Sequence, residues 1–388
     1  MNIILQISLS SLPLRYIYGN TKMNKYTIAF AVILLSSIRL IATDRCRVQN
    51  DSIQAKDTNR NYLLAIPILF YGEETQWGIG VTSGYYFTKE GRGKASNIHG
   101  TLIYTQNKQA SLTLLPKFYT ENRDFFYSGH LKLDYYPDKF FGIGRNTPDS
   151  LEENYVSKDI SFLVQRQRVM FDVIMVGFQA QWSYYNAIDF QPGGALINKT
   201  ITGTNAFFTS GLGMLATWDT RDNFFYPTEG EFYKASLMIN SKIFGSNLEF
   251  SRLTLDLRNY YPIASKHLIS LQVFGDFAWG KIPFQFLPSM GGNDVLRGYY
   301  KGRYRDNVLL ATQLEYRFPI YKWLKGSMFG SAGDVANEID ELRLKKFKTS
   351  YGFGLRARVN PANVHLRFDV GLTPDNKPAF YFTANEAF

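Results

Sequence analysis

The stretch from Asn307 to Phe318 reads NVLLATQLEYRF, and its polar and apolar residues alternate. Gln313, Glu315 and Arg317 fall on one side of an extended chain, and apolar residues fall on the other. Alternation with a period of two predicts a β-strand, because successive side chains of a strand point to opposite faces. The stretch therefore indicates a sheet with one polar face and one apolar face.

Similar alternation recurs from about residue 61 to the end of the chain. It predicts sixteen strands, at 62–70, 75–88, 95–107, 109–119, 124–136, 154–168, 170–186, 203–218, 229–242, 248–262, 266–280, 306–318, 323–336, 347–359, 362–373 and 378–388. An even number suits a closed antiparallel barrel made by one chain. The three longest connections, 137–153, 187–202 and 281–305, follow odd-numbered strands, so we expect them on one side of the membrane.

The alternation fits two architectures. A soluble β-sandwich buries its apolar face, whereas an outer-membrane barrel turns that face to lipid and encloses the polar one. Many predicted strands have about ten residues or more, where strands of soluble proteins average about five to six, which favours the barrel. Aromatic pairs near strand ends also favour it, because such residues form girdles at membrane interfaces. The expected fold is all-β, a transmembrane antiparallel β-barrel of about sixteen strands.

The composition excludes several classes of protein. One Cys rules out a disulfide framework and a cysteine-rich zinc site, and four scattered His leave little for a metal cluster, so we expect no metal and no cofactor. The longest apolar run, Ile28 to Leu35, is too short to cross a bilayer as a helix. Residues 1–42 contribute four of the 43 basic residues, which leaves 39 against 33 acidic ones, spread too evenly to indicate nucleic-acid binding.

The first 42 residues have the layout of a secretory signal peptide. Lys25 precedes the apolar run, and small residues such as Ser37 and Ala42 follow it. Met23 is an alternative start, because it would leave a compact basic head. Residues 43–60 are polar and predict a short periplasmic linker, and residues 61–388 make up the barrel. Export of this kind predicts a place in the outer membrane of a Gram-negative type of cell.

The segment from Gly291 to Tyr299 reads GGNDVLRGY, and it resembles the loop signature of the BamA/TamA-like outer-membrane assembly superfamily, the bacterial surface antigen barrel. The Arg-Gly-aromatic core is weak alone, but other segments agree in order. They resemble the family's periplasmic turn before the ninth strand, its twelfth strand and its terminal strand: DTRDN at 219–223 with YPTEG at 226–230, QLEYRFP at 313–319, and YFTANEAF at 381–388. The resemblance covers about residues 61–388.

In that family the extracellular loop with this signature folds back into the barrel. The resemblance implies that Leu296, Arg297, Gly298 and Tyr299 form the core of such a lumenal loop. A cation enclosed in the lumen is costly unless it is paired. Glu315, on the polar face of the predicted twelfth strand, is the expected partner of Arg297, through a charge-assisted hydrogen bond.

The family usually has a second acidic residue on its thirteenth strand, within a Phe-x-Asp-x-Gly stretch. The matching stretch here runs from Phe329 to Gly333, and Ser331 occupies the place of the acid. Asp334 lies three residues later, on the opposite side of the strand, and is the candidate second acid. The alternative to a locked loop is an ordinary outer loop with a solvated arginine.

The last predicted strand ends in an aromatic residue, as in the family. Phe380, Phe382 and Phe388 share one face of it. The resemblance implies that this strand signals the protein's own insertion and closes against the first strand. An edge strand with free backbone donors can also be captured by another strand.

The resemblance implies a barrel that takes part in insertion, assembly or translocation of polypeptides at the outer membrane. Residues 43–60 are too few for the polypeptide-transport-associated domains that usually precede such barrels, so we expect a short member without them. The expected partners are outer-membrane lipid, client polypeptides or a separate periplasmic protein, and no nucleic acid. The alternative is a passive pore or structural surface barrel that shares only the fold. No Ser lies in a Gly-x-Ser-x-Gly turn, so we do not expect an enzyme.

Overall fold

The structure, a computed structural model, describes residues 62–72, 76–87, 96–120, 124–358, 365–375, 377–384 and 386–388. The predicted signal peptide and linker lie outside the described residues. Within the described ranges, no helix has the length and hydrophobicity that crossing a membrane requires.

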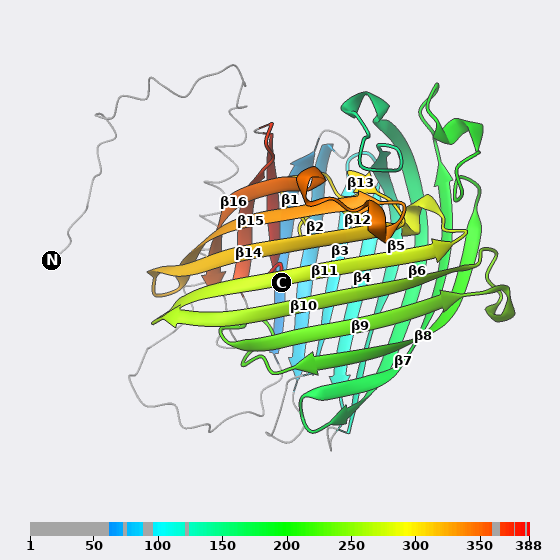
Figure 1. Ribbon diagram of the computed structural model, residues 1–388. Coiled ribbons are helices and arrows are strands. Elements are labelled where there is room, and N and C mark those ends of the chain that lie inside the picture. Colours follow the sequence, from blue (N-terminus) through cyan, green and yellow to red (C-terminus); the bar gives the residue numbers. More distant parts are fainter. Residues whose placement is uncertain are drawn as a thin grey trace, which may run out of the picture. The chain divides into compact units, whose positions relative to one another are not determined.

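Sixteen strands of the described ranges form one antiparallel sheet, and Figure 1 shows them curving around a common interior. They are β1 (Tyr62–Gly72), β2 (Gln76–Phe87), β3 (Ser96–Thr105), β4 (Ala110–Tyr119), β5 (Phe125–Phe140), β6 (Glu153–Met170), β7 (Ile174–Ile188), β8 (Phe207–Asp219), β9 (Gly230–Asn240), β10 (Phe250–Ala264), β11 (His267–Gly280), β14 (Val308–Tyr321), β15 (Leu324–Ala336), β16 (Lys348–Arg358), β17 (His365–Leu372) and β18 (Pro378–Ala384). Each pairs with the next along the chain, which confirms the predicted all-β barrel fold.

The remaining elements are short and lie in the connections. Strands β12 (Ser289–Met290) and β13 (Tyr304–Arg305) pair with each other between β11 and β14. The turns of 3-10 helix among the described residues are η1 (Asp149–Leu151), η2 (Leu196–Asn198), η3 (Lys242–Phe244), η4 (Phe284–Phe286), η5 (Ile339–Glu341) and η6 (Leu344–Lys346).

Strand β14 shows why the sheet rolls up with its polar face inward. Gln313, Glu315 and Arg317 are almost fully buried, whereas Leu314 between them is 52% exposed. This is the reverse of a water-soluble protein, in which large apolar side chains are buried and charged ones are exposed. The polar residues can be enclosed because they pair with one another. The exposed apolar side chains are suited to contact with lipid.

Contacts between distant strands place the polar face inside. Lys234 of β9 donates from Nζ to Oε1 of Gln165 on β6, over 3.3 Å. The Lys117 ammonium of β4 lies 4.1 Å from the ring centroid of Phe224, in the turn that joins β8 to β9. These pairs are not neighbours in the sheet, so the side chains meet across the interior.

The two ends of the sheet are β1 and β18. Among the described residues no backbone pairing joins them, so the ladder stops at these two edges. Strand β1 has eleven residues and β18 has seven, because β18 ends at Ala384. The prediction of a last strand over 378–388 was therefore too long. We call the boundary between β1 and β18 the seam.

Candidate functional site

The connection from β11 to β14 is a structured loop that is held at its base. Residues of η4 pack into an apolar cluster with Leu196 of η2 and with residues near strand ends: Phe140, Tyr155, Phe250 and Ala278. Strands β12 and β13 then bring the two arms of the loop together. Because both arms are fixed, the tip between them is held in one position.

The tip carries the residues that the resemblance singled out. Leu296 is fully buried with a φ of 55°, in a small apolar cluster with Met290 and Leu309. A positive φ is unfavourable for leucine, so burial of the side chain has to offset the strain. The backbone N–H of Gly298 donates to Oη of Tyr381 on β18 over 2.9 Å, and that hydroxyl donates to the carbonyl of Tyr299 over 3.2 Å. The tip is therefore attached to the last strand of the sheet.

Two glycines allow the tip to lie directly on the backbone of β17. A Cβ on Gly371 would lie 2.6 Å from the nitrogen of Gly298 and 2.7 Å from the carbonyl carbon of Arg297. Gly298 has a φ of 121°, and a Cβ there would lie 3.1 Å from the carbonyl of Leu372. At either position, any side chain larger than hydrogen would force the loop tip away from β17.

Arg297 lies fully buried between two carboxylates. Its Nη2 is 2.7 Å from Oε2 of Glu315 on β14, and its Nη1 is 2.5 Å from Oδ2 of Asp369 on β17. Its guanidinium carbon lies 3.5 Å from the ring centroid of Phe329 on β15, in a cation–π contact. The structure thus brings together Arg297 and Glu315, as the sequence predicted, and adds Asp369.

The candidate second acid, Asp334, was wrong. It is buried on β15, where its Oδ2 lies 2.8 Å from Nη1 of Arg145 in the loop after β5. Ser331, in the place of the family's acid, donates instead to the side chain of Gln313 over 3.1 Å. The second acid comes from β17, since a barrel interior lets strands two or more apart in the sheet reach the same guanidinium.

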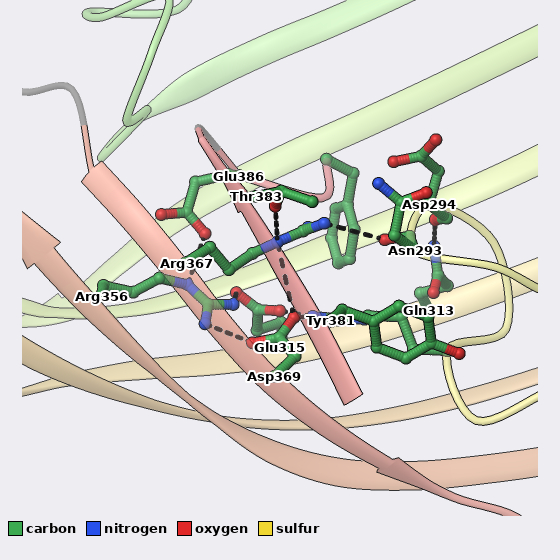
Figure 2. Close-up of polar contacts among 12 residues, drawn as sticks. Asn293, Asp294, Gln313, Glu315, Arg356, Arg367, Asp369, Tyr381, Thr383 and Glu386 are labelled. Atoms are coloured by element: carbon green, nitrogen blue, oxygen red, sulfur yellow. Dashed lines mark hydrogen bonds and ion pairs between the residues drawn. The ribbon is translucent and has the colours of Figure 1, made fainter. Parts of the chain in front are cut away.

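The Arg297 pair belongs to a larger buried network, and Figure 2 shows the part of it around Glu315, Arg356, Asp369 and Glu386. Arg356 of β16 contacts three carboxylates: Glu315 through Nη2 at 3.1 Å, Asp369 through Nη1, and Glu386 through Nε at 2.7 Å. Arg317 donates from Nε to Oε1 of Glu315 over 2.7 Å. We call Arg297, Arg317, Arg356, Arg367, Glu315, Asp369 and Glu386 the arginine cluster.

Arg367 joins the cluster to the loop from the β17 side. Its Nε donates to Oγ1 of Thr383 on β18 over 2.8 Å, and its Nη2 donates to the carbonyl of Asn293 over 3.1 Å. The Gln313 side chain also donates to a loop carbonyl, that of Asp294, over 2.6 Å. The loop is consequently held by hydrogen bonds to its backbone as well as by Arg297.

The described residues after β18 turn into the interior. Phe388 is 2% exposed, and its backbone oxygen accepts a hydrogen bond from Nη2 of Arg317 over 3.0 Å. Phe380 is 60% exposed on the outer face. The prediction that Phe388 shares a face with Phe380 and Phe382 was therefore wrong, because the chain leaves the ladder after Ala384.

The turn that joins β8 to β9 reaches the cluster from the other end of the barrel. Tyr226 is 3% exposed, and its ring centroid lies 3.5 Å from Nζ of Lys325 and 5.3 Å from the guanidinium carbon of Arg317. Its ring also lies 4.3 Å from that of His365. Arg317 thus contacts this turn on one side and Glu315 on the other.

One loop hydroxyl has a strongly shifted pKa. Burial, together with neighbouring Tyr304, raises the pKa of Tyr299 to about 12. Its hydroxyl donates to the carbonyl of Thr349 over 3.1 Å. No group of three His, Cys, Asp or Glu in the described ranges is arranged to hold a metal ion.

Sequence reasoning could have found part of this cluster. Arg317, Arg356, Arg367 and Asp369 all fall on predicted polar faces, although nothing in the sequence says which face residues meet. Glu386 has a more specific signal. In a continuous strand it would share the outer face with Phe380, and a carboxylate facing lipid is costly. Its position thus indicates that the strand ends before it.

Known proteins share the fold of this chain. Residues 89–388 match the model of the Omp85 superfamily domain. The chain is similar to BamA from Haemophilus ducreyi lacking POTRA domains 1–3, with a TM-score of 0.56 and 14% identity, covering 92% of this chain and 78% of that one.

Two further solved structures are similar. For CdiB from Acinetobacter baumannii the TM-score is 0.53 and the identity 12%, covering 84% of this chain and 59% of that one. For CdiB from Escherichia coli the values are 0.50 and 10%, covering 83% and 61%. This chain spans less than two thirds of either CdiB chain. At such identities the likeness establishes a shared fold.

Proposed function

This chain belongs to the Omp85 superfamily, and on that premise we propose that it is an outer-membrane barrel that inserts or translocates polypeptides. The observation that supports this proposal most directly is that the tip of the β11–β14 loop contacts β17 and β18, the last two strands before the seam. Gly298, Tyr299 and Arg297 all contact these two strands. A loop in this position can hold β17 and β18 in place while the seam between β18 and β1 opens.

The seam itself supplies the physical route. Strand β1 offers eleven residues and β18 only seven, so part of the β1 edge has no partner in β18 whatever the register. Unpaired backbone N–H and C=O groups at a strand edge can add a further strand. A client segment that pairs there would enter the bilayer with its backbone hydrogen bonds already made. This is required because lipid offers no partners to backbone N–H and C=O groups.

Filling of the barrel favours this function over the alternative of a passive pore. The β11–β14 loop and the arginine cluster occupy the interior beside β14 to β18, and the β8–β9 turn contacts the cluster from the other end. A pore that conducts passively needs a continuous water-filled path. Clients and a separate periplasmic protein are the partners that the proposal includes.

The experiment is to lock the seam. Cysteine pairs are placed by scanning β1 positions 63–68 against β18 positions 378–383, in a chain whose Cys46 is replaced by serine. The control is a cysteine pair at Ala65 and Ser83, which already face each other across β1 and β2. Insertion of a test barrel into vesicles should stop with the seam lock and return on reduction, while the control inserts normally. Equal insertion by locked and reduced protein would contradict the proposal.

A further inference from the structure

Two lysines on the inner wall of the barrel differ from the cations around them. Among the described residues, neither Lys117 of β4 nor Lys234 of β9 has an ion-pair partner. Other cations on the inner faces, such as Lys132, Arg252 and Arg258, each lie within 3.0 Å of an aspartate oxygen. An enclosed cation is costly unless it is paired. This part of the wall therefore carries uncompensated positive charge.

Contacts through two polar side chains bring the two lysines to the same part of the interior. Lys117 lies opposite Ser128 of β5 in the sheet, and directly opposed residues point to the same face. Oγ of Ser128 donates to Oε1 of Gln165 on β6 over 2.9 Å, and Nζ of Lys234 donates to the same oxygen over 3.3 Å. Strands β4 and β9 are five strands apart, so the two ammonium groups approach each other across the interior.

The carboxylates that attract these lysines already bind arginines. Asp219, at the end of β8, accepts from Nε and Nη2 of Arg221, over 2.9 Å each. Asp256 of β10 accepts from Nε and Nη2 of Arg258 in the same two-pronged way. Each aspartate thus neutralises one arginine. The two lysines remain as an excess of two positive charges.

Hydrogen-bond donors of the two ammonium groups are also free. An ammonium has three N–H donors. Within the described part of the chain, Lys117 contacts the ring of Phe224 but no acceptor, and Lys234 has one acceptor, Gln165. The Gln165 amide is fixed with its oxygen toward Lys234, because its Nε2 donates to Oε1 of Gln179 over 2.8 Å. The free donors suit a ligand that has several acceptor oxygens on one group.

A phosphate group matches both the charge and the donors. A phosphomonoester carries about −1.5 to −2 charges at pH 7 and three strong acceptor oxygens, whereas a carboxylate supplies a single charge. Lysine is a common phosphate ligand in proteins. Both lysines are half-buried and lie toward the β8–β9 turn, at the end of β4 and the beginning of β9. The ligand would therefore lie inside the barrel, next to that turn.

We propose that Lys117 and Lys234 form a binding site for a phosphomonoester, carried by a free small molecule or by a lipid headgroup. Bound there, the phosphate would link β4 to β9 across the interior and lie beside Phe224 of the β8–β9 turn. The site goes beyond the proposed function, because binding requires neither a client nor opening of the seam.

The first experiment is calorimetric titration of the full chain with inorganic phosphate, in a maltoside detergent that contains no phosphate and at constant ionic strength. Lys117→Gln and Lys234→Gln should each weaken binding by about tenfold or more, the effect of one charge-assisted hydrogen bond. The matched control is Lys242→Gln, whose side chain is 70% exposed, and it should bind as the unaltered chain does. Equal affinity for all four chains, or no binding by the unaltered chain, would overturn the site.

Thermal unfolding separates ligand binding from a purely structural role. Phosphate should raise the melting temperature of the unaltered chain, because a ligand that binds only the folded state stabilises it. Lys234→Gln removes an unpaired charge, so in phosphate-free buffer this variant should melt at the same temperature or higher. Lys117→Arg keeps the charge and should keep the response to phosphate. An equal response by the double variant Lys117→Gln with Lys234→Gln would refute the assignment.

Competition identifies the source of the phosphate. Displacement of inorganic phosphate by glycerol 3-phosphate alone assigns a free small molecule, and displacement by micelles that contain phosphatidic acid alone assigns a lipid headgroup. Either result supports the site. A blocked tetraglutamate peptide is the third competitor. If it displaces phosphate at a lower concentration than both phosphomonoesters, the phosphate assignment is wrong and the lysines bind an acidic polypeptide.

Discussion

Arg297 and Asp369 lie 72 residues apart in the chain, yet Nη1 of the arginine is 2.5 Å from Oδ2 of the aspartate and both side chains are fully buried. The contact joins the tip of the β11–β14 loop to β17. Because β17 pairs only with β16 and the seven-residue β18 among the described strands, this ion pair ties the loop to the end of the sheet.

We expect Asp369→Asn to lower the free energy of unfolding by about 3–5 kcal/mol, because Arg297 and Arg356 both lose a buried carboxylate. Urea unfolding in vesicles, followed by tryptophan fluorescence, measures the change. The matched control is Glu249→Gln, whose side chain is 54% exposed and pairs with the 70% exposed Lys242 at the surface. It should cost less than about 1 kcal/mol. Similar losses in both variants would argue that Asp369 has no special place in the cluster.

Gly371→Ala should detach the loop tip without removing any charge. The added Cβ would meet the backbone of Gly298 and Arg297 at 2.6 to 2.7 Å, so the tip has to move away. Gly330→Ala on β15 is the control, because nothing lies within 4 Å of a Cβ there. Heating in detergent until the folded band disappears on a gel gives the readout. The first variant should melt at a lower temperature than the second, and identical melting would refute the close contact.

Arg297→Lys should release the loop while keeping the positive charge, because an ammonium cannot bridge two carboxylates as a planar guanidinium does. Lys301 lies exposed just beyond the tip, so trypsin reports the release by cleaving after it. Loss of a charged hydrogen bond of about 1.5–3 kcal/mol should raise the cleavage rate by about tenfold or more. Arg252→Lys, which alters a separate pair with Asp276, should leave cleavage unchanged. Equal cleavage of both variants would mean that Arg297 does not hold the loop.

Tyr226 should stabilise the barrel through the face of its ring. Tyr226→Leu removes the cation–π contacts to Lys325 and Arg317, and we expect a loss of about 1–2 kcal/mol. Tyr226→Phe keeps the aromatic face and should stay within about 0.5 kcal/mol of the unaltered chain. Unfolding by urea in vesicles compares the two. A larger loss for phenylalanine than for leucine would show that the hydroxyl, and not the ring, matters.

Leu314→Arg tests the outer face of β14. An arginine in the middle of the lipid-facing band should cost about 2–4 kcal/mol. Ile243→Arg is the control, because Ile243 is 88% exposed in the β9–β10 connection, outside the strands. Only the first substitution should lower the fraction of chain that folds into vesicles. Normal folding of Leu314→Arg would contradict a lipid-facing position.

The alternation of residues determined most of the fold. Gln313, Glu315 and Arg317 fall on one face of their strand because the side-chain period of a strand is two, and burial on β14 follows that parity. The lengths of the runs between turn residues set sixteen strands with nearly the observed bounds. This information is local, so one sequence suffices to read it.

The site depended on distances that no local pattern contains. The pairing of Arg297 with Glu315 was predicted from a resemblance, but Asp369 enters only because the curved sheet lets β14 and β17, three strands apart, reach the same guanidinium. Asp334, closer in sequence, lies on the wrong side of its strand and pairs with Arg145. Which polar residues of an inner face meet is set by the curvature and register of the whole sheet.

The end of the last strand shows what the sequence determines and what only the tertiary structure determines. The sequence already places Glu386 on the same parity as Phe380, where a charge would face lipid, and so requires the strand to stop. Only the tertiary structure supplies the destination, the guanidinium groups of Arg356 and Arg317, because they come from strands 30 and 69 residues earlier in the chain. A buried carboxylate is stable only beside opposite charges, and folding of the whole sheet brings these arginines together.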